Sequence, residues 1–509
     1  MPHPRPPPEP RHTAQASAPP STSRPAVYKP RISRNFPRSR NGCLTCKSRK
    51  KKCDETHPVC GCCAKKNLDC SWPESKAQKE GARHHVAAQL RLKPGELNKS
   101  QVSSYSLMGS SSSLLCHQWS LSYSREFLNN PNSRLLFDRY LSRTSVQLGI
   151  ISPKGNPFIH CVLPLAFSDK LVMNCILALA GVEYGEEIPA VTVPTIWKHY
   201  SLVLRDLKAS VSQGMQEEKR LHLLLVTIFL AIFESISGNS QTSLHHLKAS
   251  RQLVLSISSN PSSLLTQEHR DVWGFLLEMY SYRALIASIT PLGAVESQPI
   301  IVDPFLNSLS TLTQYKTYGF QFSFGYSLFQ FIPEVSQITN QRMAEENSGT
   351  FSASTYMSYM SLRSRLSSWN SCILAEETNI GSQNIVAATI YQNSLLIYLY
   401  SYFCDSDPGT LLEMELLANR AFPLLISLSQ SQVASIMMWP TLMVSSCLRQ
   451  EEQYDMVREG ISHVDFNSKT VKQCLELLNL LWADSDLRAY GPRGLDLIMK
   501  KKGWSLYMS

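Results

Sequence analysis

Seven of the 14 cysteines in this 509-residue chain lie within residues 43–70. Six of these seven form two consecutive C-x2-C-x6-C units, and they are Cys43, Cys46, Cys53, Cys60, Cys63 and Cys70. A C-x2-C pair places two sulfurs on one tetrahedral ion, and the third cysteine returns after a short helical run. Zinc takes four ligands, so six thiolates can serve two ions only if two of the thiolates bridge both. The spacing therefore favours one compact cluster of two Zn²⁺ ions over two separate sites.

Other uses of cysteine fit this stretch poorly. A disulfide framework does not explain a basic run between the second and third cysteines, and we expect no signal peptide. A redox C-x2-C site is also disfavoured, because no βαβ pattern surrounds it. Cys62 is an irregularity, since using it as the ligand in place of Cys63 would shorten the second pair to C-x-C. We therefore expect Cys62 to be an exposed thiol outside the cluster.

Basic residues lie in two of the intervals between these cysteines, 47–52 and 64–69. Residues 1–75 hold 15 Lys and Arg against 5 Asp and Glu, and the rest of the chain holds 35 against 35. The net charge of +10 therefore belongs to the cysteine-rich end. Basic side chains here offset the charge of the thiolates, and they place any polyanion-binding surface at this end, although any single one can also be a solvated surface charge. The candidate residues for binding a polyanion such as DNA are Lys47, Arg49, Lys50, Lys51, Lys52, Lys65 and Lys66.

The cysteine spacing, the basic run and Pro58, two residues before the fourth cysteine, resemble the fungal Zn2Cys6 binuclear-cluster DNA-binding domain. The resemblance implies that a helix of the first half enters the major groove over a CGG-type triplet. It also implies that the base-reading lysine falls on Lys50, four residues after the second cysteine. A lysine can donate to O6 and N7 of guanine. The second half, with Lys65 and Lys66, is expected to pack against the first and to contact the DNA backbone.

The cluster domain is expected at residues 41–72, between two segments without a core. Residues 1–40 contain 11 of the 29 prolines and no apolar periodicity, which predicts a disordered basic arm. This arm serves phosphate contact or nuclear import, or is only a solvated tail. Residues 73–116 are expected to be a charged and serine-rich linker. No a/d heptad there is long enough for the coiled coil that many relatives carry after the cluster, so the residues leave monomer and homodimer open.

From residue 117 to residue 509 the pattern is helical throughout. Apolar residues recur at intervals of three and four, which predicts a large all-α domain, and no apolar run is long enough to cross a membrane. Pro423 is expected to end its helix early. The predicted helices include Ser133–Val146, Asp169–Glu183, Trp197–Gln213, Lys219–Ser237, Gln241–Ser258, Thr266–Ile289, Ile385–Asp405, Leu411–Arg420, Glu451–Gly460 and Ser468–Trp482.

This helical region resembles the fungal-specific transcription factor domain of the second type, over roughly residues 120–509. The resemblance implies a regulatory domain that governs the activity of the DNA-binding module. The segments that carry it are Asn156-Pro157-Phe158, Leu163–Ala166, Ile176–Gly181, Leu221–Ser237, His245–Arg251 and Trp439-Pro440.

No catalytic motif stands out. The chain has no G-x-S-x-G, Walker loop, H-E-x-x-H or dinucleotide fingerprint. His245 and His246 are adjacent and so point to different faces of a predicted helix, which favours a packed or solvated pair over a metal site. We therefore predict that the chain is not an enzyme.

The two resemblances together imply a nuclear transcription factor of the RNA polymerase II type. It would read CGG-like sites in DNA, work with the transcription machinery or co-regulators, and activate a metabolic or secondary-metabolite gene set. No acidic activation segment is evident, so the activating role rests on the resemblance. The alternative is a helical regulatory or ligand-sensing protein, or a repressor, in which the zinc cluster is mainly structural.

Overall fold

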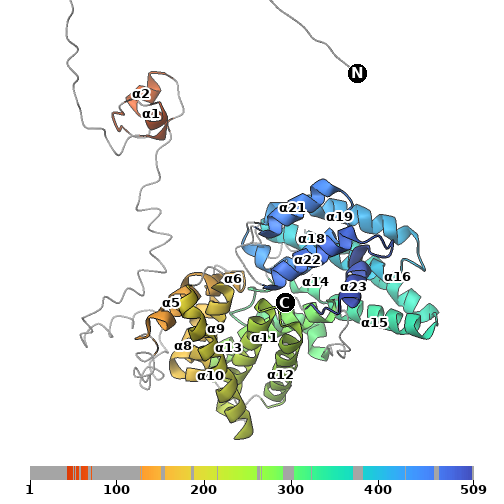
Figure 1. The fold of residues 1–509 in the computed structure, drawn as a ribbon, viewed down its shortest axis with the longest axis horizontal. Helices are drawn as coiled ribbons and strands as arrows, with labels where there is room; N and C mark the ends of the chain where they lie inside the picture. Colours follow the sequence, from red (N-terminus) through yellow and green to blue (C-terminus); the bar gives the residue numbers. More distant parts are fainter. Residues whose placement is uncertain are drawn as a thin grey trace, which may run out of the picture. The chain divides into compact units, whose positions relative to one another are not determined.

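The chain forms two compact units, Met1–Ser110 and Ser111–Ser509 (Figure 1). The predictions of a disordered arm at 1–40 and a linker at 73–116 lie outside the residues that the structure describes. In the computed structural model, the described residues are 43–49, 51, 53–56, 59–66, 70, 127, 129–150, 155–184, 189–214, 216–260, 264, 266–290, 303–322, 324–370, 382–429, 431–462 and 469–506.

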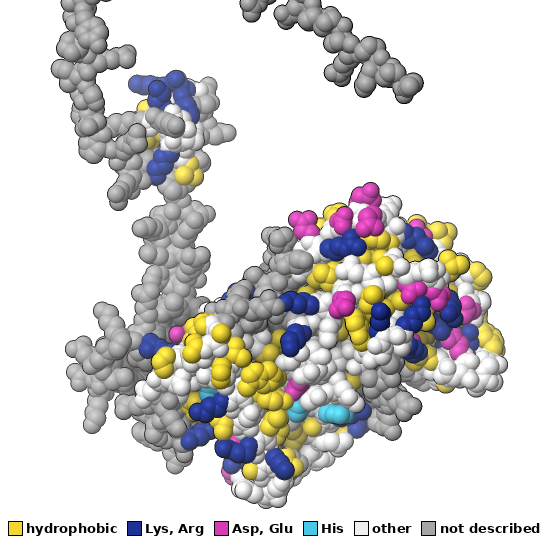
Figure 2. All heavy atoms as spheres, in the orientation of Figure 1, with side chains coloured by type: hydrophobic (Ala, Val, Ile, Leu, Met, Phe, Trp, Pro, Cys, Tyr) yellow, Lys and Arg dark blue, Asp and Glu magenta, His cyan; other side chains and the backbone are white. Residues whose placement is uncertain are grey.

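The first unit contains two short helices, α1 (Leu44–Ser48) and α2 (Gly61–Ala64). Each helix follows directly after the first cysteine of a C-x2-C pair, so the second cysteine of that pair lies within the helix. Neither helix is long enough to be stable by itself in water, so other contacts must hold both. Dark blue Lys and Arg side chains lie over the described surface of this unit (Figure 2).

The second unit is built of helices joined by turns and irregular segments, and its described residues agree with the predicted all-α domain. Its first group of helices is drawn in orange to green in Figure 1, and its second group in green to blue. The first group comprises α5 (Pro131–Arg139), η3 (Tyr140–Thr144), α6 (Ser145–Gln147), α7 (Pro157–His160), α8 (Val162–Ser168), α9 (Lys170–Tyr184), η5 (Ala190–Thr192), α10 (Val193–Ser212), η6 (Glu217–Lys219), α11 (Arg220–Ile236), α12 (Ser240–Ser259) and α13 (Gln267–Ser288). The second group comprises η8 (Pro304–Gln314), α14 (Tyr326–Phe329), α15 (Ile332–Ser348), α16 (Ala353–Ser368), α18 (Ser382–Ser401), α19 (Gly409–Leu428), η9 (Gln432–Ile436), α20 (Met438–Ser445), α21 (Glu451–Ser462), α22 (Lys469–Ala483) and α23 (Gly491–Lys502).

Two helices that are apolar on nearly every side form the centre of this unit. On α11 every residue from Leu223 to Ile236 is buried, and this helix packs against α9, α12 and α13. On α18 every residue from Asn393 to Ser401 is buried, and this helix packs against α16, α19, α20 and α23. A helix that is apolar all round must be covered on all sides, so the other helices wrap around these two.

Aromatic hydroxyls and an indole join the two groups of helices. The hydroxyls of Tyr282 on α13 and Tyr391 on α18 lie 2.9 Å apart, and Tyr391 donates to the carbonyl of Ile436 at 2.6 Å. Trp439 on α20 donates its indole N–H to the carbonyl of Ile289 at 3.3 Å. All these groups are buried, so each bond offsets a desolvation cost and fixes how the two groups meet.

A buried carboxylate holds the segment that follows η8. Glu278 on α13 accepts backbone N–H groups from Gly319 at 3.1 Å, Gln321 at 2.8 Å and Phe322 at 3.0 Å. Burial raises the pKa of Glu278 to about 7, although these N–H groups oppose the rise. The backbone of this segment is irregular, and these N–H groups donate to Glu278 in place of water.

The expectation that Pro423 ends its helix was wrong. Helix α19 runs on to Leu428 and contains Pro423. The proline is exposed, as is Asn419 four residues before it, so the carbonyl that loses its helical partner lies where water can reach it. Phe422 and Leu425 on the opposite side are buried, and their packing outweighs the lost hydrogen bond.

Candidate metal centre and nucleic-acid interface

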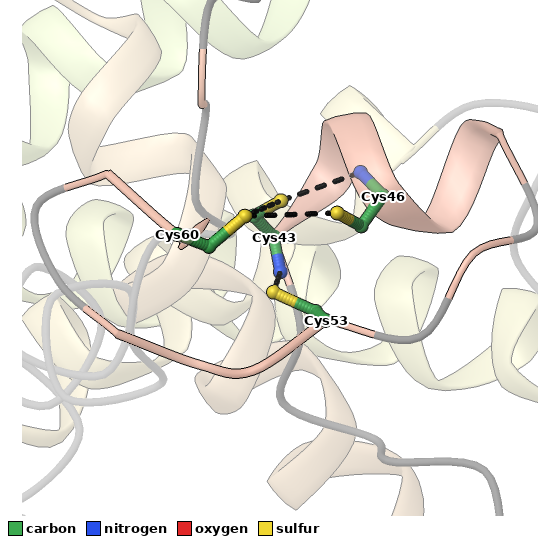
Figure 3. Close-up of side chains that lie close together, drawn as sticks. All are labelled: Cys43, Cys46, Cys53 and Cys60. Atoms are coloured by element: carbon green, nitrogen blue, oxygen red, sulfur yellow. Dashed lines mark hydrogen bonds between the residues drawn. The ribbon is translucent and has the colours of Figure 1, made fainter. Parts of the chain in front are cut away.

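Six cysteine sulfurs converge in the first unit. They form two groups of four. Within each group the sulfurs lie within 4.8 Å of one another, and both groups contain Cys43 and Cys60. One group adds Cys46 and Cys53 and is drawn in Figure 3, where the four side chains point toward one another. The other group consists of Cys43, Cys60, Cys63 and Cys70. Among the described residues, no other His, Cys, Asp or Glu side chains form such a group.

The sulfur spacings fit tetrahedral zinc. A tetrahedral site with Zn–S bonds of about 2.3 Å separates its sulfurs by about 3.8 Å. The sulfurs of Cys43 and Cys60 lie 3.7 Å apart, those of Cys46 and Cys60 3.6 Å, and those of Cys43 and Cys63 3.8 Å. Four sulfurs converge in each group, and these spacings suit thiolates around shared cations.

The backbone repeats the same contact in both halves. The N–H of Cys43 donates to the sulfur of Cys53 at 3.4 Å, and the N–H of Cys60 donates to the sulfur of Cys70 at 3.3 Å. The N–H of Cys46 also donates to the sulfur of Cys43, at 3.3 Å. N–H groups that point at sulfur stabilise the thiolate and orient it for a metal. The two C-x2-C-x6-C units therefore repeat the same N–H to sulfur contact as well as the same spacing.

The pKa values of cysteine thiols in the two groups are shifted in different directions, and a bound cation would favour the thiolate form of all of them. Burial raises the pKa of the Cys63 thiol to about 12 and that of Cys46 well above its usual range. Burial also opposes ionisation of Cys43 and Cys60, but backbone N–H groups and hydrogen bonds from neighbouring thiols together outweigh it and lower the pKa of both. The two sulfurs common to both groups therefore ionise more readily than those of Cys46 and Cys63. A divalent cation beside a thiol deprotonates it outright.

A carboxylate links the two halves of the cluster. Asp54 follows the third cysteine, and both of its oxygens accept the backbone N–H of Gly61, at 2.9 and 3.1 Å. Gly61 is the first residue of α2, so Asp54 satisfies an N–H that has no partner within that helix. A Cβ atom at Gly61 would lie 2.5 Å from Oδ2 of Asp54, so any larger residue there would displace this carboxylate.

The described basic residues lie on the outside of the cluster. Lys47 is exposed in the last turn of α1, Arg49 is half-buried at its end, and Lys51 is exposed just beyond. Lys65 and Lys66 are exposed after α2. Lys50, Lys52 and Pro58, which the sequence also singled out, lie outside the described residues.

Three exposed side chains complete this surface. Cys62 is exposed, as expected for a thiol outside the sulfur groups, while its neighbour Cys63 is buried within one. Leu44 and Val59 are about half exposed, at 47% and 48%. The sequence did not single out these two, because a lone apolar residue between cysteines reads as part of a core.

Comparison with known proteins identifies the chain. The family model described as "Fungal specific transcription factor domain" matches residues 134–509, and that described as "Fungal Zn(2)-Cys(6) binuclear cluster domain" matches residues 41–79. The chain belongs to the fungal Zn2Cys6 transcription factors. Members of this family bind zinc through the cysteine cluster, bind DNA and regulate transcription, and they are not enzymes. Both resemblances seen in the sequence are therefore confirmed.

Individual relatives match this transcription factor only over short stretches. Sterol uptake control protein 2 of Candida albicans is 63% identical over 35 residues, which is 7% of this chain and 5% of that protein. Transcription factor lfc1 of Flammulina velutipes is 43% identical over 47 residues, 9% of this chain and 17% of that protein. Transcription activator AMTR1 of Alternaria alternata is 64% identical over 33 residues, 6% and 4% of the two chains. The chain thus spans less than a fifth of the length of each of these three relatives. No solved structure matches it.

The histidines that the sequence singled out on the helical unit of this transcription factor form no metal site within its described residues. His245 is exposed and His246 is half-buried on α12, and neither belongs to a group that could hold a metal among the described residues. Burial lowers the pKa of His246, which keeps it neutral and packed. Within the described part of the chain, every helix is too short or too polar to cross a membrane.

Proposed function

We propose that the six cysteines hold two zinc ions and that Cys43 and Cys60 bridge them. The observation that supports this is the pair of sulfur groups that share these two residues. Each ion then has four thiolate ligands, and no further ligand is needed. The cluster carries a charge of −2 from six thiolates and two divalent ions, which the surrounding lysines and arginines offset.

We further propose that this cluster reads CGG-like sites in double-stranded DNA through α1 and the basic run after it. Lys47, Arg49 and Lys51 surround the end of α1 and suit phosphate contact. Lys50 is the candidate for base reading, by its place in the resemblance. Lys52, Lys65 and Lys66 would add backbone contact.

Binding of the full chain to duplexes with and without CGG, at several salt concentrations, tests this proposal. We expect a clear preference for CGG duplexes and a fall in affinity with salt that reports the number of phosphate contacts. Equal affinity for a scrambled duplex would overturn the proposal that the protein recognises CGG, and it would favour a zinc cluster with a mainly structural role.

The role of Lys50 can be tested separately with single substitutions. Lys50→Ala should reduce the preference for CGG by about 1–3 kcal/mol, because a base contact carries sequence information. Lys65→Ala is the matched control, and it should weaken binding to all duplexes alike and reduce the salt dependence. Uniform weakening by Lys50→Ala would mean that it contacts phosphate alone.

In the cell, we propose, the protein acts in the nucleus as an activator of a metabolic or secondary-metabolite gene set, with co-regulators and as a monomer or a homodimer. One relative is named a transcription activator, which agrees with this proposal. Mapping of bound sites across the genome, combined with expression changes on deletion, tests it. If bound genes rise on deletion, the protein is a repressor. If the expression of no bound gene changes, the result favours the alternative of a ligand-sensing protein in which the zinc cluster is mainly structural.

A further inference from the structure

The outer face of α10 carries a stripe of exposed apolar side chains. Their intervals of four, seven and seven residues place them along one side of a helix with 3.6 residues per turn. The buried residues of α10 are Ile196, His199 and Val203, and the helix packs against α9. The stripe residues, in order, are Val193, Trp197, Leu204 and Val211, and Val191 lies exposed just before them.

Trp197 is held in a fixed orientation within this stripe. It is 48% exposed, and its ring meets those of Tyr200 and Phe233 edge-on, at 5.7 and 5.8 Å. Tyr200 stacks on Phe233 at 4.5 Å, and its hydroxyl donates to the carboxylate of buried Glu234. A half-exposed tryptophan that is already immobile loses little freedom on binding, which is why tryptophan is enriched among the residues that dominate interfaces.

Basic side chains lie along one side of the stripe. All charged residues that are exposed on α10 are basic, namely Lys198, Arg205 and Lys208. Asp206 is half-buried and pairs with Arg205 at 2.7 Å. Lys198 and Lys208 have no ion pair among the described residues. Dark blue side chains lie over this part of the helical unit in Figure 2, at its lower left.

We propose that the α10 stripe docks an amphipathic helix of a partner protein whose apolar side is flanked by Asp and Glu. A straight apolar stripe over five turns fits the side of another helix. The lysines beside it select acidic flanks and reject basic ones. A second copy of this chain is a poorer occupant, because pairing two such stripes would bring the basic residues of both copies together. This inference does not rest on the DNA sites proposed above.

Two matched peptides of about three heptads test the proposal against the full, zinc-loaded chain. Both carry leucines along one side; one has glutamates on the flanks and the other has lysines. Fluorescence anisotropy of labelled peptide measures the affinity at low and high salt. We expect the acidic peptide to bind at least about tenfold more tightly than the basic one, with an advantage that shrinks as salt rises.

Variants of the stripe assign the binding to α10. Trp197→Ser and Leu204→Glu should each weaken binding of the acidic peptide about tenfold or more. The double variant Lys198→Glu with Lys208→Glu should reverse the preference in favour of the basic peptide. Leu412→Glu is the control, because Leu412 is an exposed leucine on α19 of the same unit and should leave binding unchanged. Unaltered thermal unfolding of each variant excludes misfolding as the cause.

Four outcomes would overturn the proposal. The first is equal binding of the two peptides, and the second is binding that Leu204→Glu and the lysine variants leave unchanged. The third is weak peptide binding together with tight binding to anionic vesicles that Leu204→Glu removes, which would make the stripe a lipid-binding surface. The fourth is a dimer of the chain that Leu204→Glu dissociates, which would make it a self-association surface. DNA affinity measured in parallel distinguishes each from a failure of the DNA proposal.

Discussion

The two units of this protein are held together by different interactions. In the cluster unit the described buried apolar residues are all cysteines, and Cys70 packs against them. In the helical unit one continuous apolar core runs from Leu136 to Leu506. The first unit therefore depends on its metal, and the second depends on packing. Because their sources of stability differ, we expect each unit to stay folded when the other is disrupted.

Loss of a sulfur that is common to both groups should have the largest effect. Cys43→Ser removes a ligand from both sulfur groups, and zinc supplies about 10–16 kcal/mol of folding free energy in small structural sites. We expect the variant to lose both zinc ions and DNA binding while its helical circular dichroism and main thermal transition stay as in the parent. Metal analysis and calorimetry measure these quantities.

Cys62→Ser is the matched control, because Cys62 is exposed and outside both sulfur groups. It should retain two zinc ions per chain. A Cys43→Ser variant that still holds two zinc ions would show that Cys43 does not bridge. Loss of helical content in that variant would show that the two units depend on each other.

A core truncation should produce the opposite result. Phe229 lies in the middle of α11 with no exposed surface, and Phe229→Ala leaves a cavity that costs about 3–5 kcal/mol. Denaturant unfolding of the helical unit should show this loss, with the zinc content unchanged. Leu412→Ala is the control, because Leu412 is an exposed residue on α19, and it should reduce the free energy of unfolding far less. Zinc loss on Phe229→Ala would contradict the independence of the units.

Glu278 should make the stability of the helical unit depend on pH. Its folded pKa of about 7 lies above its usual value of 4.5, so its contribution is fully present below pH 4.5 and is lost as pH rises through 7. The loss is about 3 kcal/mol at most. Glu278→Gln keeps an oxygen for the same N–H groups and should flatten the profile between pH 5 and 8. Glu452→Gln, at an exposed position, should leave the slope as in the parent.

The gathering of the six cysteines could be predicted from the sequence, because six thiolates have few ways to give each Zn²⁺ ion four ligands. The sequence did not indicate which sulfurs are common to both groups, since that depends on how the halves fold onto each other. For the helical unit, the intervals of three and four located helices such as α11 and α13. They did not foresee that α19 continues past Pro423, because buried neighbours distant in sequence decide that outcome. They also passed over the stripe on α10, where Trp197 and Leu204 look like core residues until the packing is known.

The smallest effect should come from the contact between Asp54 and Gly61, and it tests how the two halves of the cluster are coupled. Asp54→Ala removes the acceptor of the Gly61 N–H and should cost about 1 kcal/mol, as the loss of a helix cap does. Gly61→Ala places a Cβ where the carboxylate lies, so the carboxylate must leave the same N–H and the cost should be similar. The double variant should cost no more than either single one, because both substitutions break one contact. Competition with a zinc chelator measures each free energy. Costs that simply add would mean that Gly61→Ala disturbs the backbone of α2 itself, and that the contact with Asp54 is incidental.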